Sequence, residues 1–472
     1  MERICPGYLF GSAMLAVVLG GCSSSPLDFS NRSLSGPSHM VMPEGVEEWS
    51  HRQVDDPDLP VLNESAGLND YLRFAALRNA GLEAQFQAWR AAVERVPQVG
   101  VLPDPRFTYG YYLGEVETRV GAMQHMVSLS QTFPWFGKLQ DREDAAARNA
   151  MAAYQRFEAA RLALNLRVET AYNDLFYLER SIEITRDNLE LLEQFERVAQ
   201  ARYQVAAAGH PDVIRVQVEF GKLEDRLRQQ RDLRAPLVAR LNAALNRPAE
   251  TVIPSITGIA QRESLASIEE LFSVLQEQNP ELRALAEEIE RERIGAEIAR
   301  KDGKPDLTVG VAYTAIAERS GVSLAENGDD SVLATFSINL PIWREKYDAK
   351  VREAVAKRLA VSSRRTEVSN RLSSELRRAI FDHHDARRRV DLFSNTLIPK
   401  ATESLEASLS GFTQGATDFF DLIDAERTLL EFQLGLERAR VDRATSYAHI
   451  EQLIGTRLVE IEGRPGPEGE TP

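Results

Sequence analysis

Residues 131–140 read QTFPWFGKLQ, and this stretch separates two different structural periods. Before it, apolar and small polar residues alternate, as they do in a β-strand with two unlike faces. After it, residues 138–208 contain neither glycine nor proline, so a helix much longer than a globular core requires can run through them. Proline ends a strand ladder because it has no amide donor. We therefore interpret residues 134–137 as a joint between a strand and a long helix.

The same joint occurs a second time, at residues 338–346, which read INLPIWREK. Other motifs repeat in the same order: NAGL at 79–82 matches NPEL at 279–282, and PRFT at 105–108 matches PDLT at 305–308. Repetition of this kind indicates a duplicated supersecondary unit. We divide the chain into a lipoprotein signal peptide (1–21), a lipid-anchored linker (22–63), a first repeat (64–250), a linker (251–266), a second repeat (267–456) and a disordered tail (457–472).

Each repeat is predicted to contain two strands, at about 105–113 and 125–133 in the first and about 306–316 and 332–340 in the second. One face of each strand carries large apolar side chains, and the other carries mostly serine, threonine, glycine and alanine. A strand of about ten residues can cross a bilayer when tilted. The pattern favours strands between lipid and a water-filled lumen; two soluble hairpins lying on a core are the alternative.

Four strands are too few to close a barrel, because about eight are needed. An open sheet edge in hydrocarbon leaves backbone groups unsatisfied, at several kcal/mol each. If the strands cross a membrane, several chains must therefore share one barrel. A cyclic trimer supplies twelve strands, although the spacing alone does not exclude a dimer.

The remaining sequence predicts helices. An opening helix is expected at 69–96 and its counterpart at 267–301; long helices are expected at 138–208 and 346–410, the second kinked at Pro399; returning helices are expected at 212–246 and 418–454. Apolar residues at coiled-coil spacing follow the first long helix. Long antiparallel hairpins packed side by side form a hollow barrel or a rigid stalk. The fold class is thus mainly α with a membrane β-barrel, built from a duplicated strand-strand-helix-helix unit.

The amino terminus has the pattern of a bacterial lipoprotein leader. A short basic start precedes an apolar run at 8–19, which ends in LGGC at 19–22. Lipidation is expected on Cys22, and Ser23 favours sorting to the outer membrane. An ordinary signal peptide with a chance cysteine is the alternative. Because Cys5 leaves with the leader, no cysteine remains for a disulfide or a thiolate metal site.

Composition excludes several function classes. The net charge of −15 disfavours nucleic acid as a partner. We find no catalytic motif and expect no cofactor. The segment DHHD at 382–385 resembles a metal site, but neighbouring side chains on a helix point about 100° apart, and zinc pairs favour histidines at i and i+4. A solvated helix face is the preferred interpretation of this segment.

These features together resemble the TolC family of outer-membrane efflux ducts, over residues 69–455. The resemblance is carried by the duplicated order, by NPEL, by PDLTVG at 305–310, by QTFPWFGK and by FTQGATDFFDLIDAERTLLE at 412–431. The joint and the cysteine are most similar to the heavy-metal branch of the CusC and CzcC type. The family implies a homotrimer with a twelve-stranded barrel, a periplasmic helical tunnel, a periplasmic adaptor and an inner-membrane RND-type pump.

The resemblance also implies a gate at the inner tip of the periplasmic helical tunnel. Asp421 and Asp424 match the paired tip aspartates of the family and share one helix face. Asp212 matches Asp421 in the first repeat, where Arg215 stands in place of the second acid. Gly209 and Gly415 are the turn residues of the two tips. The alternative is that these acids only cap helices and favour the helix dipole.

The joint residues have a role of their own. Pro134 and Pro341 are expected to end strands, and Gly137 is the last residue of the first joint. The aromatic residues Trp135, Phe136 and Trp343 are suited to the membrane–water interface. The alternative is that these aromatic side chains fill a core beneath the joint.

Three functions are weighed for the whole protein. The first is export of heavy-metal cations, and the second is export of organic compounds or proteins by the same fold. The third is a lipid-anchored coiled coil that forms no pore.

Overall fold

The structure is a computed structural model that describes residues 59–205, 209–260, 265–321, 323 and 325–458. The expected signal peptide, Cys22, almost all of the first linker, part of the second linker and residues 459–472 lie outside the described residues. No described helix is both long enough and apolar enough to cross a membrane.

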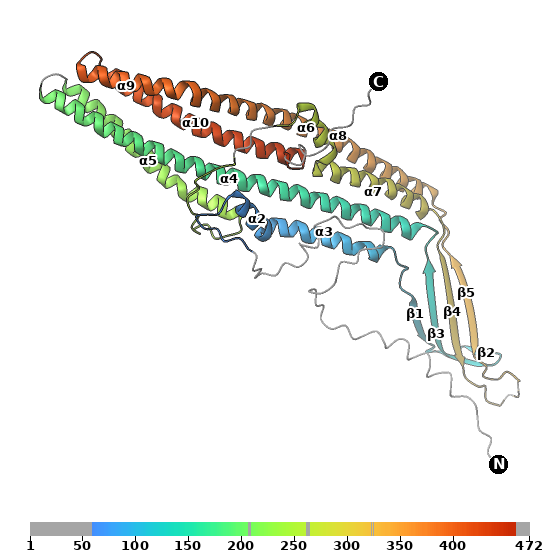
Figure 1. The fold of residues 1–472 in the computed structure, drawn as a ribbon. Helices are drawn as coiled ribbons and strands as arrows, with labels where there is room; N and C mark the ends of the chain where they lie inside the picture. The colour runs from blue at the N-terminus through green and yellow to red at the C-terminus, as the bar shows by residue number, and fades with distance from the viewer. Residues whose placement is uncertain (1–58, 206–208, 261–264, 322, 324, 459–472) are drawn as a thin grey trace, which may run out of the picture. The chain divides into compact units, whose positions relative to one another are not determined.

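Helices dominate the described chain. They are α2 (Leu68–Arg78), α3 (Ala80–Val99), α4 (Lys138–Gln204), α5 (His210–Ala244), α6 (Ile268–Gln278), α7 (Pro280–Asp302), α8 (Arg344–Leu392), the π-helix η1 (Phe393–Leu397), α9 (Ile398–Gln414) and α10 (Phe419–Ile454). The strands are β1 (Arg106–Tyr111), β2 (Glu117–Thr118), β3 (Gly121–Phe133), β4 (Leu307–Ile316) and β5 (Ser331–Ile338). The strands lie at one end of the long helices, and the last turn of α4 and the α9–α10 turn lie at the other (Figure 1).

The sheet joins the two repeats. Its order is β1-β3-β4-β5, with every pair antiparallel, so β3 of the first repeat pairs with β4 of the second. The register aligns the alternating faces across the sheet. Phe107 pairs with Leu129, and Leu129 with Val311, so apolar side chains share one face. Ser130 pairs with Gly310, which pairs with Thr335 on the opposite face.

The strands differ from the expected ranges at their ends. β3 begins at Gly121 rather than at 125, because residues before the alternating apolar stretch also pair, with β2. β5 ends at Ile338 rather than at 340, three residues before Pro341. β1 is shorter than expected, ending at Tyr111.

The opening helices were wrongly expected to be continuous. Each is broken at an asparagine, Asn79 or Asn279, whose backbone is extended. The Asn79 side-chain oxygen accepts from the Leu82 amide at 3.0 Å, and that of Asn279 accepts from the Leu282 amide at 3.1 Å. Both residues therefore cap a new helix, as asparagine commonly does. The expected end of the first opening helix at 96 is also wrong, since α3 continues through Pro97 to Val99.

The same asparagines explain why this motif repeats. The Asn79 amide nitrogen donates to the Ala244 carbonyl at 2.9 Å, and that of Asn279 donates to the Leu453 carbonyl at 2.8 Å. Each bond ties the opening of a repeat to the end of its own returning helix. Both asparagines are buried, so each bond satisfies groups that would otherwise be unpaired.

The second long helix changes its period where the sequence predicts a kink at Pro399. The residues just before the proline form the π-helix η1. Proline lacks the amide that would bond to the carbonyl four residues earlier, so the ladder upstream must adjust. Gly435 of α10 faces the first residue of η1, Phe393. A Cβ at Gly435 would lie 2.8 Å from the Phe393 ring, so only glycine lets α10 approach η1 this closely.

The helices pack in a different order in the two halves of the bundle. Near the strands, α4 packs between α3 and α7, and α7 packs on α8. Toward the tips, α4 packs against α5 and α10, and α10 packs against α9. One apolar core lies between α4, α5, α9 and α10, and a second lies between α6, α7, α8 and α10. The first of these cores stabilises the end that carries the expected gate.

Candidate functional site: the helical tips and the strand–helix joint

The two expected gate acids of the second repeat lie on the first turns of α10. Asp421 and Asp424 are exposed, whereas the intervening Leu422 and Ile423 are buried in the tip core. The helix thus presents both acids on one solvent-facing stripe, three residues apart.

The acid of the first repeat is held differently. The Asp212 carboxylate accepts from the Gly209 amide at 3.2 Å, so it caps the start of α5. Arg215 lies 3.8 Å from the same carboxylate on the next turn. Both contacts are local to α5. Asp212 therefore caps the first turn of α5, and Arg215 lies beside that cap on the same helix. This arrangement agrees with the interpretation that the acid serves as a helix cap.

The two turn glycines hold different positions. Gly415 ends α9 in the left-handed region, with φ of 79°. Gly209 precedes α5 in an extended conformation, with φ of −84°. Only Gly415 needs the freedom of glycine, since side chains with a Cβ are strained at positive φ. The turn after Gly415 is tight, because the Ala416 amide donates to the Gly411 carbonyl at 2.8 Å.

An arginine of the first repeat reaches the turn of the second. The Arg202 guanidinium lies 4.5 Å from the centroid of Phe412, and Phe412 lies edge-on to Phe419 at 5.2 Å. Both phenylalanines are buried. A cation over an aromatic face is attracted by the ring quadrupole. This contact joins the tips of the two hairpins within one subunit.

A charged cluster crosses from α5 to α10 just above the tips. The Arg427 Nε donates to Glu219 at 3.0 Å, and Lys222 donates to the same carboxylate at 2.9 Å. Beside it, Glu426 is 2% exposed, and its Oε1 has no hydrogen-bond partner among the described residues. Burial, with a smaller effect of the Glu219 charge, raises the pKa of Glu426 to about 7. A titratable group therefore lies inside the core that supports the gate.

The joint residues divide into exposed aromatics and a buried ionic link. Phe136 and Trp343 are 87% and 71% exposed in the subunit, which contradicts the alternative that they fill its core. Gly137 has φ of 73° and precedes α4, while Trp343 precedes α8. Pro134 directly follows β3, whereas Pro341 lies three residues after the end of β5.

Lys138 makes the buried ionic link. Its side chain is 4% exposed, and its Nζ lies 2.9 Å from Asp306 and 3.9 Å from Asp302. Asp306 also accepts from the Trp135 amide at 2.8 Å. The first joint is thereby attached to the residue that precedes β4 of the second repeat.

Sequence reasoning missed Arg202, Glu426, Lys138 and Asp306. Glu426 left a signal, because a glutamate stands where the apolar spacing of α10 expects a core residue. Lys138 left none, since a lysine in the first turn of a helix is ordinarily solvated.

The segment at 382–385 is not a uniformly solvated face, so that interpretation was wrong. His383 is 1% exposed and lies against Tyr447, with its Nδ1 3.3 Å from the Arg443 carbonyl. Burial lowers its pKa to about 4, which keeps the ring neutral. Asp382 pairs with Arg378 and Asp385 with Arg389, each at 2.9 Å. Among the described residues, no three His, Cys, Asp or Glu side chains form a group able to hold a metal.

A duplicated unit with aligned apolar strands, long helices and acid-bearing tips defines a class of protein, the subunit of an outer-membrane channel with a helical extension. The sequence profile of the outer membrane efflux protein family matches residues 62–247 and 271–456. The chain belongs to this family, whose members are passive channels and not enzymes. It is an efflux channel subunit of the outer membrane.

Relatives and solved structures agree with this assignment. The chain is 23% identical to the outer membrane protein TolC of Vibrio cholerae, over 91% of this chain and 94% of that protein. It is 22% identical to nodulation protein T of Rhizobium leguminosarum bv. viciae, over 95% and 93%. The fold is similar to the outer-membrane channel OprN, with a TM-score of 0.71, 16% identity and coverage of 83% and 90%. It is also similar to CusC, with a TM-score of 0.67, 13% identity and coverage of 86% and 99%.

Proposed function

We propose that three copies of this chain form one channel, which passively conducts substrate from an inner-membrane RND-type pump and a periplasmic adaptor to the outside. The observation that carries this proposal is the open sheet. Among the described residues, β1 and β5 each pair on one side only, so both edges are free. Every residue of β5 is exposed in the single subunit. Lipid cannot satisfy such edges, whereas β5 of one copy can pair with β1 of the next.

A trimer places three copies of the acidic stripe around one axis. Asp421 and Asp424 would then contribute six carboxylates to the periplasmic entrance, a ring that favours cations. The exposed aromatic residues at the joint support a membrane boundary there. We further propose that Cys22 carries the lipid that anchors the chain to the outer membrane, on the LGGC pattern at 19–22.

Heavy-metal cations are the cargo that we propose. The support is the resemblance of QTFPWFGK and of the lipidation pattern to the heavy-metal branch, together with the acidic tips. Organic compounds are the second candidate, because the helices and lumen face carry no stretch rich in methionine or histidine that would select a metal.

Deletion of the gene, followed by growth tests, decides between the two cargoes. The panel contains copper, silver, zinc, cadmium, cobalt and nickel salts beside dyes, detergents and antibiotics. Sensitivity confined to one or two metals, and reversed by restoring the gene, is the expected result. Sensitivity to organic compounds alone would still support an export channel but would contradict heavy-metal cations as its cargo.

A further inference from the structure

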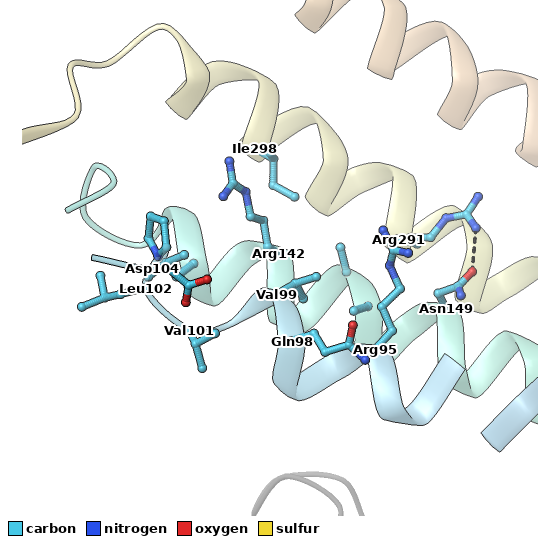
Figure 2. Close-up of a pocket in the computed structure, with 14 residues that line it drawn as sticks. Arg95, Gln98, Val99, Val101, Leu102, Asp104, Arg142, Asn149, Arg291 and Ile298 are labelled. Carbon is cyan, nitrogen blue, oxygen red and sulfur yellow. Dashed lines mark hydrogen bonds between the residues drawn. The ribbon is translucent and has the colours of Figure 1, made fainter. Parts of the chain in front are cut away.

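A cavity of about 890 Å³ lies where the helices meet the strands, between α3, α4 and α7. Three arginines line it, Arg95 from α3, Arg142 from α4 and Arg291 from α7 (Figure 2). The only carboxylate in its wall, as far as the structure describes it, is Asp104. Arg291 is paired with Glu292, so Arg95 and Arg142 supply the positive charge of this cavity in a chain whose overall charge is −15.

The arginines differ in how they are held. Arg291 is fixed by Asn149 at 3.0 Å and by Glu292 at 2.6 Å. Arg95 and Arg142 are exposed, and neither forms an ion pair with another described residue. Their guanidinium donors are therefore available to a ligand. Forked guanidinium groups bind phosphate and carboxylate with two parallel bonds, so the cavity fits an anionic group.

The rest of the wall is mostly apolar, apart from Gln98 and Asn149. Val99, Val101, Leu102 and Ile298 line the cavity, and Val101 and Leu102 are 62% and 44% exposed. A hydrophilic anion alone gains nothing from this surface. A molecule with an anionic head and a hydrocarbon tail buries both parts of the wall.

The cavity also lies at the level of the joint. Its loop, which includes Pro103 and Asp104, runs directly into β1. Gln131 of β3 donates to the Pro103 carbonyl at 2.8 Å, which ties this loop to the strands. This inference rests on the proposed function: with the strands in the outer membrane, the cavity lies at the depth of lipid headgroups.

We propose that this cavity binds an amphiphile with a phosphate or similar anionic head, held by Arg95 and Arg142. A membrane phospholipid and an anionic amphiphile carried as cargo share this chemistry. The proposal does not depend on metal export, since it concerns a different part of the subunit.

The first arm of the test uses the full-length protein in nanodiscs of phosphatidylglycerol and phosphatidylcholine. Native mass spectrometry then counts the phosphatidylglycerol retained by the released protein. The second arm titrates dodecyl phosphate, and separately inorganic phosphate, into protein in a neutral detergent. The variant is Arg95→Gln with Arg142→Gln, and the matched control is Arg167→Gln, an exposed arginine of α4 outside the cavity.

We expect the double variant to lose at least about tenfold in affinity, because two charge-assisted contacts disappear, while the control is unchanged. Lysine at both positions restores part of the binding by charge alone. Loss of phosphatidylglycerol retention identifies a lipid site. Loss confined to dodecyl phosphate identifies the amphiphile as cargo. Equal binding by the double variant and the control in both arms would overturn the proposal.

Discussion

The Arg202 guanidinium lies 4.5 Å from the centre of the Phe412 ring, and this contact joins the two hairpin tips of one subunit. Arg202 belongs to α4 of the first repeat, and Phe412 belongs to α9 of the second. Because Phe412 also packs on Phe419 at the start of α10, the arginine supports the turn that precedes Asp421. The geometry of the proposed gate therefore depends on both repeats.

Replacing Arg202 with alanine is expected to loosen this turn. A cation–π contact contributes about 1 kcal/mol, so amide exchange at Gly415 and Ala416 rises about fivefold. Hydrogen exchange of the purified protein measures this change. Arg197→Ala is the control, since Arg197 is exposed and lies 4.0 Å from its partner Glu193. Equal exchange in both variants would contradict the proposed support.

Neutralising the two tip acids is expected to alter the entrance of the channel. With Asp421→Asn and Asp424→Asn, block of single-channel current by multivalent cations weakens, because the carboxylate ring is gone. Glu406→Gln, an exposed acid on α9, keeps the wild-type block. Unchanged block in the double variant would remove both aspartates from a gating role.

The two turn glycines are expected to respond differently to alanine. At Gly415, φ of 79° places alanine in a strained region, and the free energy of unfolding falls by about 1 kcal/mol. At Gly209, φ of −84° is accessible to alanine, so the backbone strain expected at Gly415 is absent and the loss is smaller. Thermal unfolding of both variants gives the comparison, and equal losses would contradict the assigned conformations.

The pKa of Glu426 predicts a dependence of stability on pH. In the unfolded chain this pKa is 4.5, and burial raises it to about 7 in the fold. The folded state then binds the proton more tightly, so its stabilisation is complete below pH 4.5 and is lost as the pH rises to 7. Glu426→Gln is expected to remove this loss and to stabilise the protein by about 3 kcal/mol at pH 8, with little change at pH 4.

Thermal unfolding at pH 4 and pH 8 checks this prediction. Glu431→Gln, an exposed glutamate on the same helix, is the control. If Glu426→Gln and the control show the same difference between the two pH values, Glu426 is not the group that titrates.

The buried ion pair between Lys138 and Asp306 at the first joint is expected to contribute to the free energy of unfolding. Asp306→Asn removes the carboxylate 2.9 Å from the buried Lys138 and leaves Asp302 at 3.9 Å as the nearest charge. We expect the free energy of unfolding to fall by about 2 kcal/mol, because the lysine becomes a poorly compensated buried charge. Asp329→Asn is the control, because it makes the same substitution at an exposed position between β4 and β5. A similar melting temperature for the two variants would refute the role of this link.

The duplicated architecture could be predicted because it depends on local signals. Period-two alternation, long stretches free of glycine and proline, and the paired joints at Pro134 and Pro341 each report on backbone geometry directly. The break at Asn79 was missed, because a capping asparagine inside a helical pattern has the same apolar spacing on either side. Its bond to Ala244 joins residues far apart in sequence, which a local pattern does not reveal.

The site was less predictable than the fold for a related reason. Arg202 and Phe412 become partners only when two repeats pack side by side, and Lys138 becomes buried only when β4 reaches the first joint. The role of Asp212 as a helix cap could be read from its position in the first turn, since that interaction is local.

Planar-bilayer recording of the purified full-length protein, combined with its oligomeric mass, tests the central claim most directly. The account predicts a trimer that inserts into the bilayer and opens discrete cation-selective channels, with selectivity reduced by Asp421→Asn and Asp424→Asn. A monomer that remains a soluble rod after removal of its lipid anchor, and that gives no channel current, would contradict the account.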